Sequence, residues 1–553
     1  MVRPLAARPA IDGGGVTETA ASPRLARTSA LIGLGTLASR VTGFLRVSAL
    51  AALGFDRLTD VYNVANSTPN IVYELLLGGV LTATLVPLFV ASYENDDPDA
   101  TTSINTVAVT LLLSGTILGT LAAPWIVDFY FGVAVTGAGT GRAAQQALAT
   151  DLLRWFMPQM LFYGITALAT AMLNARRRFA AAAFAPSLNN VVVIAALLAV
   201  GRVATTPPTV QSVLDDPVLV VLLGLGTTAG VVAMTLVLLP SLRQSGAPLR
   251  WHWAPRHPAV RRLVRLSGWT VGYVAANQVA FFVVLVLAYR RGAGPSVYLA
   301  AFTFFQLPHG LLAVSVMTAL GPELASRHQA DDRNGLRAHF SRGLDLLLIV
   351  MIPAAVGLII LARPLISVVL DHGDFTAVSV ARTATTLRAF AVGLVAFSVY
   401  LYVVRTFSSM QNTRAAFLIN LVENAVNIGT AFLFYRWWGV AGLAWSWSLA
   451  YCVGAVVALF SLRRPLERLN GRSLAATAGR VLVATTPAAL AAIGIAAATG
   501  SNTPSESFVT LLAAGAAGGI LFVATGRLVG FDLIAQLRSL VRRDGRTTAA
   551  PDA

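Results

Sequence analysis

The chain has 553 residues, of which 56% are hydrophobic and only 12% are charged, about half the charged fraction of an ordinary soluble protein. Its formal net charge is +16, and all of its basic residues are arginines, which fall in short segments between long apolar runs. Nucleic-acid binding needs basic residues gathered on one surface with aromatic residues. The composition therefore excludes a soluble globular domain, argues against a nucleic-acid partner and indicates a polytopic membrane protein.

The residues of the common catalytic and metal sites are also missing from the sequence. The single cysteine, Cys452, lies in an apolar run, which excludes a disulfide framework and a thiolate metal site. The six histidines have no ligand spacing, and a chain without lysine has no phosphate-binding loop of the Gly-x-x-x-x-Gly-Lys type. We therefore expect a protein that is not an enzyme and needs no cofactor, with no metal ligands identifiable from the sequence.

Apolar runs of about twenty residues predict an all-α fold with fourteen transmembrane helices. Residues 1–29 precede them without a cleavable signal peptide, and we expect a disordered cytoplasmic tail there and a second cytoplasmic tail at residues 531–553. The predicted spans are residues 30–53, 61–92, 104–131, 149–174, 183–201, 217–240, 264–289, 295–320, 343–362, 378–409, 414–435, 440–462, 474–498 and 507–530.

The distribution of arginine predicts the orientation of these spans. Segments that share a side with the N-terminus hold 26 arginines, including residues 176–178, whereas the opposite side holds seven and the others lie in or near spans. Arginine is enriched in cytoplasmic segments of membrane proteins. We therefore expect both termini to be cytoplasmic, in agreement with an even number of helices.

The first twelve spans have the pattern of two copies of a six-helix unit. Pro69 and Pro308 are 239 residues apart, Pro87 and Pro322 are 235 apart, and the turns that begin near Asn174 and Asn412 are 238 apart. An even-numbered repeat enters and leaves on one side, so the copies are parallel, with a site expected between them. The predicted domains are an N-lobe (residues 30–240), a C-lobe (241–462) and a helix pair (463–530) that forms a dimer surface, an assembly contact or a groove for a lipid tail.

The first predicted span carries two arginines, although a charge at the membrane centre costs about 3 kcal/mol or more. Arg40 and Arg46 are six residues apart, which places them roughly 120° apart around a helix. They are expected to line two walls of one cavity and to bind phosphate oxygens. The alternative is that either arginine extends to a membrane interface.

Acidic residues near the second span are possible partners of these arginines. Asp60 and Glu74 flank its start, and Asp60 has the alternative role of capping the helix after Thr59. Glu74 lies deeper, beside Tyr73, and we expect it to face protein or water.

The eleventh span has a carboxylate among amides. Glu423 and Asn427 are four residues apart and so share a helix face, with Asn420 and Asn424 nearby. Such a set is expected either to hold Na⁺ or a proton and so couple transport to an ion gradient, or to form interhelical hydrogen bonds worth about 0.6 kcal/mol each.

Several segments together resemble the MurJ/MviN family. They are Ser39 to Arg46, Thr59-Asp60, Pro69-Asn70 to Val86-Pro87, Leu173-Asn174, Phe184 to Asn190, Phe305 to Gly310 and Gly373-Asp374-Phe375. The resemblance extends over about residues 30–530, and Asn70 to Gly79 resemble the form of an actinobacterial variant.

The resemblance implies the fold of the multidrug/oligosaccharidyl-lipid/polysaccharide (MOP) exporter superfamily, in which two six-helix lobes surround a cationic cavity and the last helix pair forms a groove for the undecaprenyl tail. It implies a lipid II flippase of the bacterial inner membrane that acts in peptidoglycan synthesis and is driven by membrane potential or by an Na⁺ or H⁺ gradient. The implied partners are the undecaprenyl-pyrophosphate-linked substrate, membrane lipids and cell-wall synthesis proteins. Arg40 and Arg46 match the family's first-helix arginines, to which the resemblance assigns the pyrophosphate contact.

The sequence departs from the family pattern at cavity positions. Val47 replaces a usual Asp, while Tyr73 or Glu74 and also Thr303 stand where the family often has arginines, so the cavity is expected to be less cationic. The alternatives are a MOP exporter of another undecaprenyl-linked glycan, a multidrug exporter and a non-transporting scaffold. The predicted substrate-binding residues are Arg40, Arg46, Asp60, Tyr73, Glu74, Thr303 and Gln306, and the predicted ion-coupling residues are Glu423, Asn424 and Asn427.

Overall fold

The computed structural model describes residues 23–78, 85–134, 141–248, 250–466, 471–500 and 503–531, and within these ranges it contains helices and no strands. The predicted all-α fold is therefore confirmed. Helix α1 begins at Pro23 and so includes residues 23–29 of the predicted N-terminal tail. The first 22 residues of that tail and all but one of the residues of the C-terminal tail lie outside the described ranges.

The first half of the chain forms helices from α1 to α12. Their bounds are α1 Pro23–Ala51, α2 Arg57–Tyr73, the π-helical turn η1 Glu74–Gly78, α4 Leu85–Glu94, α5 Pro98–Leu121, α6 Ala123–Ala134, α7 Arg142–Phe156, α8 Pro158–Ala175, α9 Ala180–Val203, α10 Val210–Asp215, α11 Pro217–Leu236 and α12 Leu239–Gln244.

The second half forms helices from α13 to α21. Their bounds are α13 Pro258–Tyr289, α14 Gly294–Pro308, the π-helical turn η2 His309–Ala313, α15 Val314–Gln329, α16 Arg333–Leu370, α17 Ala377–Val392, α18 Leu394–Ser409, α19 Thr413–Leu466, α20 Gly471–Thr499 and α21 Pro504–Leu528.

Ten helical stretches in the described residues are long and apolar enough to cross a membrane, and eleven if the α17–α18 pair, bent by 48°, is counted as one span. The stretch Thr413–Arg463 is one of the ten, although Gly439 (φ 57°, ψ −131°) interrupts it between the predicted spans 414–435 and 440–462. The predicted spans 30–53 and 61–92 are not among the ten. Membrane insertion is thus supported, and the count of fourteen stays a prediction.

Short polar side chains fix where several helices begin. The Asp56 carboxylate accepts hydrogen bonds from the backbone N–H groups of Leu58 and Thr59 at the start of α2, while the Thr59 hydroxyl accepts one from the Asp56 N–H. Thr503 and Glu506 form the same reciprocal arrangement at the start of α21. Such caps satisfy N–H groups that have no partner within the helix. They therefore set the residue at which each of these helices begins.

Backbone features repeat along the two halves. The π-helical turns η1 and η2 begin 235 residues apart. Left-handed turn residues recur at Asp96 and Asp331, again 235 apart, and at Arg177 and Gln411, 234 apart. These separations are close to those of the proline and asparagine pairs in the sequence, and so they support the predicted duplication.

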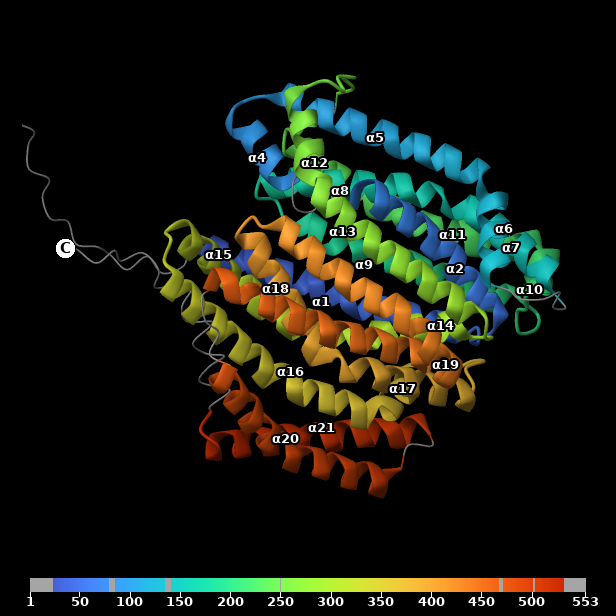
Figure 1. The fold of residues 1–553 in the computed structure, drawn as a ribbon. Helices are drawn as coiled ribbons and strands as arrows, with labels where there is room; N and C mark the ends of the chain where they lie inside the picture. Colours follow the sequence, from blue (N-terminus) through green and yellow to red (C-terminus); the bar gives the residue numbers. More distant parts are fainter. Residues whose placement is uncertain are drawn as a thin grey trace, which may run out of the picture.

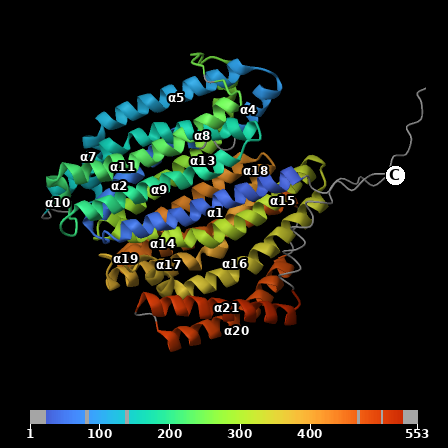
Figure 2. The same ribbon diagram turned by 180° about the vertical axis from the view of Figure 1, so that it is seen from behind.

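Helix α1 lies in the middle of the molecule, between α9 on one side and α16 on the other (Figure 1 and Figure 2). Its Ala49 belongs to the apolar core of the first-half helices, whereas its Ala51 belongs to that of the second half. Helix α13 crosses the same division, since Val286 and Tyr289 pack into the first-half core and Val284 and Leu287 into the second. These two helices therefore bring side chains to both halves, while the exact lobe boundaries stay a prediction.

Helices α20 and α21 form a separate pair at the edge of the molecule, beside α16 (Figure 1). They pack on α16 through a small apolar core in which Ile349 and Ile352 meet Val481, Ala484 and Phe522. Their positions match the predicted spans 474–498 and 507–530 to within a few residues. The outer faces of the pair remain apolar and exposed, for example at Leu490 and Ile520, as expected for helices in contact with lipid.

Candidate substrate cavity

The two arginines of α1 lie on different faces of the helix. The Arg40 guanidinium lies against Gly310 of η2, where an added Cβ would be only 2.8 Å from Nη2. Arg46 follows six residues later in the same unbroken helix, and so it diverges from Arg40 around the axis as predicted. Both arginines are half-buried.

Contacts with α9 hold this part of α1. The side-chain amide of Asn190 donates to the Ser39 carbonyl oxygen (3.2 Å) and to the Thr42 hydroxyl (3.1 Å). A Cβ at Gly35 would lie 2.7 Å from the Ala183 Cβ, so a small residue is needed for the two helices to approach this closely. These contacts flank Arg40 in sequence and fix the rotation of α1.

The sequence predicts that Asp60 pairs with these arginines, but the structure gives it a different partner. It is fully buried, and its Oδ1 accepts hydrogen bonds from the Ser296 backbone N–H (3.2 Å) and hydroxyl (2.9 Å). It therefore caps α14 from the other half, whereas α2 is capped by Asp56. Both sequence interpretations, pairing with the arginines and capping its own helix, are wrong, because the partner is 236 residues away along the chain.

Asp60 belongs to a set of hydrogen bonds that joins the two halves at one end of the molecule. Ser296 also donates to Thr59 (3.1 Å between the oxygens), and Asn63 donates to Ser296. Nearby, the Asp374 N–H donates to the Ala52 carbonyl oxygen at 3.0 Å. We call this set, with Ser48 and its contacts to Val369 and His372, the closed end.

The other predicted substrate-binding residues lie on the two sides of α1. The Tyr73 ring is 5.9 Å from that of Tyr163, and Glu74 begins η1 half-buried, with no ion pair to either arginine in the described chain. Gln306 is half-buried one turn before Gly310. Thr303 donates its hydroxyl to the Leu299 carbonyl oxygen of its own helix (2.9 Å). The Thr303 hydroxyl is therefore already bonded within its own helix.

One ionisable residue beside the contact between Arg40 and Gly310 was missed in the sequence. His309 of η2 is buried, its Nδ1 lies 3.0 Å from the Ser398 hydroxyl of α18, and its ring lies 4.6 Å from that of Phe397. The available signal was that His309 stands within a predicted span, directly before the glycine that Arg40 contacts.

The predicted ion-coupling residues separate into two neighbouring groups. Asn420 and Asn424 each donate to the Asn277 side-chain oxygen of α13 at 2.9 Å. Glu423 is 1% exposed beside them, and its Oε2 has no hydrogen-bond partner. Asn427 instead accepts a hydrogen bond from Ser446. In the described residues, no group of three or more His, Cys, Asp or Glu side chains could hold a metal ion.

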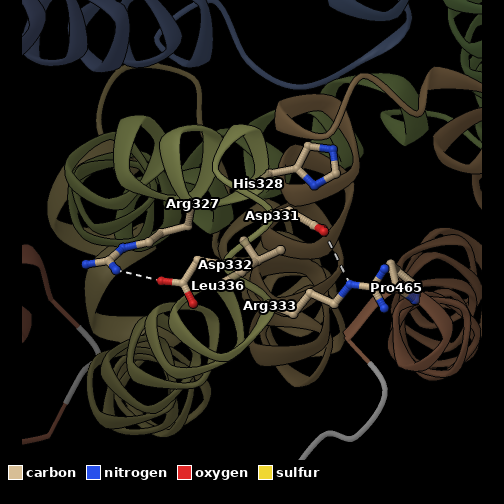
Figure 3. A pocket seen from close by; sticks show the side chains of 7 residues that line it. All are labelled: Arg327, His328, Asp331, Asp332, Arg333, Leu336 and Pro465. Carbon is tan, nitrogen blue, oxygen red and sulfur yellow. Dashed lines mark hydrogen bonds and ion pairs between the residues drawn. The ribbon is translucent and has the colours of Figure 1, made fainter.

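A small pocket of about 200 Å³ lies where α15 ends and α16 begins (Figure 3). Its charges pair internally, since Arg327 contacts Asp332 at 2.6 Å and Arg333 contacts Asp331 at 3.5 Å. The Gly335 N–H and then the Arg327 guanidinium hold the pKa of Asp332 below its usual value. This pocket is therefore not a candidate for the phosphate-binding site.

Comparison with known proteins gives one consistent family. Residues 50–513 match the family model described as lipid II flippase MurJ. The chain is 28% identical to the lipid II flippase MurJ of Burkholderia cenocepacia over 78% of this chain and 82% of that protein. It is also 28% identical to the probable lipid II flippase MurJ of Rhizobium tropici, over 82% and 83% of the two chains.

Solved structures show the same fold. The chain resembles a lipid II flippase MurJ in an inward closed conformation, with a TM-score of 0.73, 21% identity and coverage of 93% of this chain and 100% of that one. It also resembles an inward-facing multidrug resistance MATE transporter of the MOP superfamily, with a TM-score of 0.62, 14% identity and coverage of 77% and 95%. The expected MOP fold is confirmed.

Proposed function

Because the chain belongs to the lipid II flippase MurJ family, we propose that it moves lipid II from the inner to the outer leaflet of the membrane by alternating access. It is a membrane transporter, and transport rather than catalysis is its activity. The observation that carries the proposal is the position of two half-buried arginines, Arg40 and Arg46, on α1, the helix that packs into the apolar cores of both halves.

These arginines suit a pyrophosphate group. A guanidinium donates two parallel hydrogen bonds to phosphate oxygens, and such charge-assisted bonds are roughly twice as strong as neutral ones. In the described chain, neither arginine forms an ion pair with a carboxylate. A ligand that carries negative charge between the halves therefore gains two partners without displacing an internal one.

The closed end supports alternating access. Asp60, Ser296 and Asn63 join the halves through side-chain hydrogen bonds. We expect this end on the outer side of the membrane, since the arginine distribution predicts cytoplasmic termini. In this state the headgroup enters from the cytoplasmic side, and release outward requires these bonds to break. Such contacts are individually weak in membranes, about 0.6 kcal/mol, so the closed end is able to open.

We further propose that the helix pair α20–α21 guides the undecaprenyl tail, since its exposed outer faces are apolar. We also propose that both termini lie on the cytoplasmic side of the bacterial inner membrane, as the arginine distribution predicts. The basic tails there would contact anionic lipid headgroups or cell-wall synthesis proteins.

Depletion of the protein tests this function. Lipid II should then accumulate in the inner leaflet, and expression of the wild-type chain should restore its translocation. Normal lipid II translocation after depletion, together with loss of another surface glycan or of drug resistance, would contradict this function. It would show that a protein of this fold transports a different substrate here.

Glu423 and Asn424 are the residues that we propose to couple transport to a Na⁺ or H⁺ gradient. A buried carboxylate oxygen without a partner costs several kcal/mol unless it is protonated or ion-bound, and Glu423 Oε2 has no partner among the described residues. We expect Glu423→Gln to remove the response of the translocation rate to an imposed Na⁺ or pH gradient in vesicles. A variant that responds to both gradients as the wild type does would contradict the coupling role.

A further inference from the structure

Four arginines lie near one another beside the closed end, on the side of the membrane opposite the N-terminus. They are Arg57 at the start of α2, Arg290 and Arg291 between α13 and α14, and Arg436 at the bend of α19. The sequence places only seven arginines on this side, where arginine is normally scarce. More than half of them therefore meet in one place, and we call these four the arginine cluster.

The loop between α13 and α14 holds two members of the cluster. The Arg57 Nη1 atom donates to the Tyr289 carbonyl oxygen at 2.6 Å, and a Cβ at Gly292 would lie 3.8 Å from the Arg57 Nε. The Arg290 Nη2 atom donates to the Val133 carbonyl oxygen of α6 at 3.3 Å. A guanidinium has five N–H donors, so both arginines keep donors for a further partner.

The third member, Arg291, lies against the bend of α19. Its Cζ is 5.8 Å from the centroid of the Tyr435 ring, and a Cβ at Gly439 would come within 3.1 Å of its Nη1. Gly439 also has a positive φ of 57°, which glycine adopts without strain. Arg436, the fourth member, follows Tyr435 directly, and both Arg291 and Arg436 are exposed. The bend of α19 thus carries one arginine and receives another.

Two exposed tryptophans mark the depth of the cluster in the membrane. Trp437 and Trp438 follow Arg436, are 59% and 54% exposed, and have ring centroids 5.7 Å apart. Tryptophan is enriched where the lipid headgroups lie. The bend also joins the predicted spans 414–435 and 440–462 directly, so it has to lie at the membrane surface. The guanidinium groups beside it are therefore level with lipid phosphates.

No internal anion neutralises this charge. In the described chain, none of the four arginines forms an ion pair with a carboxylate. Neighbouring positive charges repel one another, whereas a phosphate between them removes that cost and accepts charge-assisted hydrogen bonds. The adjoining surface of α19 is apolar and exposed at Phe432 and Leu433, which suits acyl chains. A phospholipid offers both parts in one molecule.

We propose that the arginine cluster, with Trp437 and Trp438, binds the headgroup of an anionic phospholipid in the leaflet at the closed end, which we expect to be the outer leaflet. The site lies between the two halves, since Arg57 belongs to α2 and Arg436 to α19. This inference goes beyond the proposed function, because it does not depend on which substrate the protein moves.

A fluorescent reporter beside the cluster tests the proposal in the full-length protein. In a Cys452→Ser background, Leu433→Cys carries a bimane label on the exposed surface of α19, one turn before Trp437. The protein is placed in nanodiscs that contain brominated phosphatidylglycerol or brominated phosphatidylcholine, which quench the label. Quenching at increasing fractions of each lipid gives their relative association constants. The same label at Leu118→Cys, 65% exposed on α5, reports ordinary lipid contact.

We expect phosphatidylglycerol to associate at the Leu433→Cys label about fivefold more tightly than phosphatidylcholine. At Leu118→Cys the two lipids should associate equally. Arg291→Gln/Arg436→Gln should bring the ratio close to one, whereas Arg291→Lys/Arg436→Lys should keep most of the preference, because the charge remains. Arg202→Gln is the matched control, since Arg202 is an exposed arginine on the same predicted side at the end of α9, and it should keep the wild-type ratio.

Three results would overturn the proposal. The first is equal association of the two lipids beside the cluster in the wild-type protein. The second is an unchanged ratio in Arg291→Gln/Arg436→Gln, or an equal loss in Arg202→Gln. The third is a lipid preference that inorganic phosphate abolishes while sodium chloride of equal ionic strength does not, since the cluster would then bind the free ion.

Discussion

Replacing Arg46 with alanine is expected to lower the rate of lipid II translocation roughly hundredfold, because two charge-assisted hydrogen bonds at about 1.5 kcal/mol each are lost. Arg46 is a half-buried cation on α1, and in the described chain it forms no ion pair with a carboxylate. Translocation in vesicles and complementation of a flippase-depleted strain measure the effect.

Arg154→Ala is the matched control for this variant. Arg154 lies in the same half of the molecule, but it is exposed on α7 and contacts Asp151 at 3.6 Å. Exposed pairs contribute little, so translocation by Arg154→Ala should equal that of the wild type. Normal growth of the depleted strain with the Arg46→Ala protein, at wild-type protein levels, would remove Arg46 from the site.

Cross-linking the closed end is expected to stop transport completely and reversibly. The hydroxyl oxygens of Thr59 and Ser296 are 3.1 Å apart across the two halves, which suits a disulfide between cysteines at these positions. In a Cys452→Ser background, oxidised Thr59→Cys/Ser296→Cys protein should not release lipid II outward, because the halves cannot separate. Reduction should restore translocation.

The two single-cysteine variants separate this effect from damage to the site. Each removes one hydroxyl from the closed end, and each should translocate at a similar rate before and after oxidation. Full activity of the double variant with its disulfide formed, as verified by the shift in gel mobility, would show that this end does not open during transport.

The sequence predicts the parts of this molecule that depend on local composition. Apolar runs of membrane length identify the helices. The six-residue spacing of Arg40 and Arg46 predicts that they diverge around α1, because helix geometry alone sets that angle. The repeat can also be recognised from local sequence. Asp96 and Asp331, for example, adopt the same left-handed turn at the ends of corresponding helices.

What the sequence does not predict is decided by packing between distant segments. Asp60 caps α14 because the halves meet at Ser296, and nothing near Asp60 in the chain indicates that partner. His309 meets Ser398, and Gly310 meets Arg40, only when α18 and α1 pack on η2. In the same way, Asn277 of α13 completes the amide group around Asn420 and Asn424, whereas Asn427, predicted with them, bonds to Ser446.

The most direct measurement is the appearance of lipid II on the far leaflet of vesicles that contain the purified protein. We expect the wild-type chain to accelerate this appearance over protein-free vesicles and Arg46→Ala not to accelerate it. An ordinary phospholipid without a pyrophosphate should not be moved. Equal rates with and without the protein, or equal movement of lipid II and the phospholipid, would contradict it.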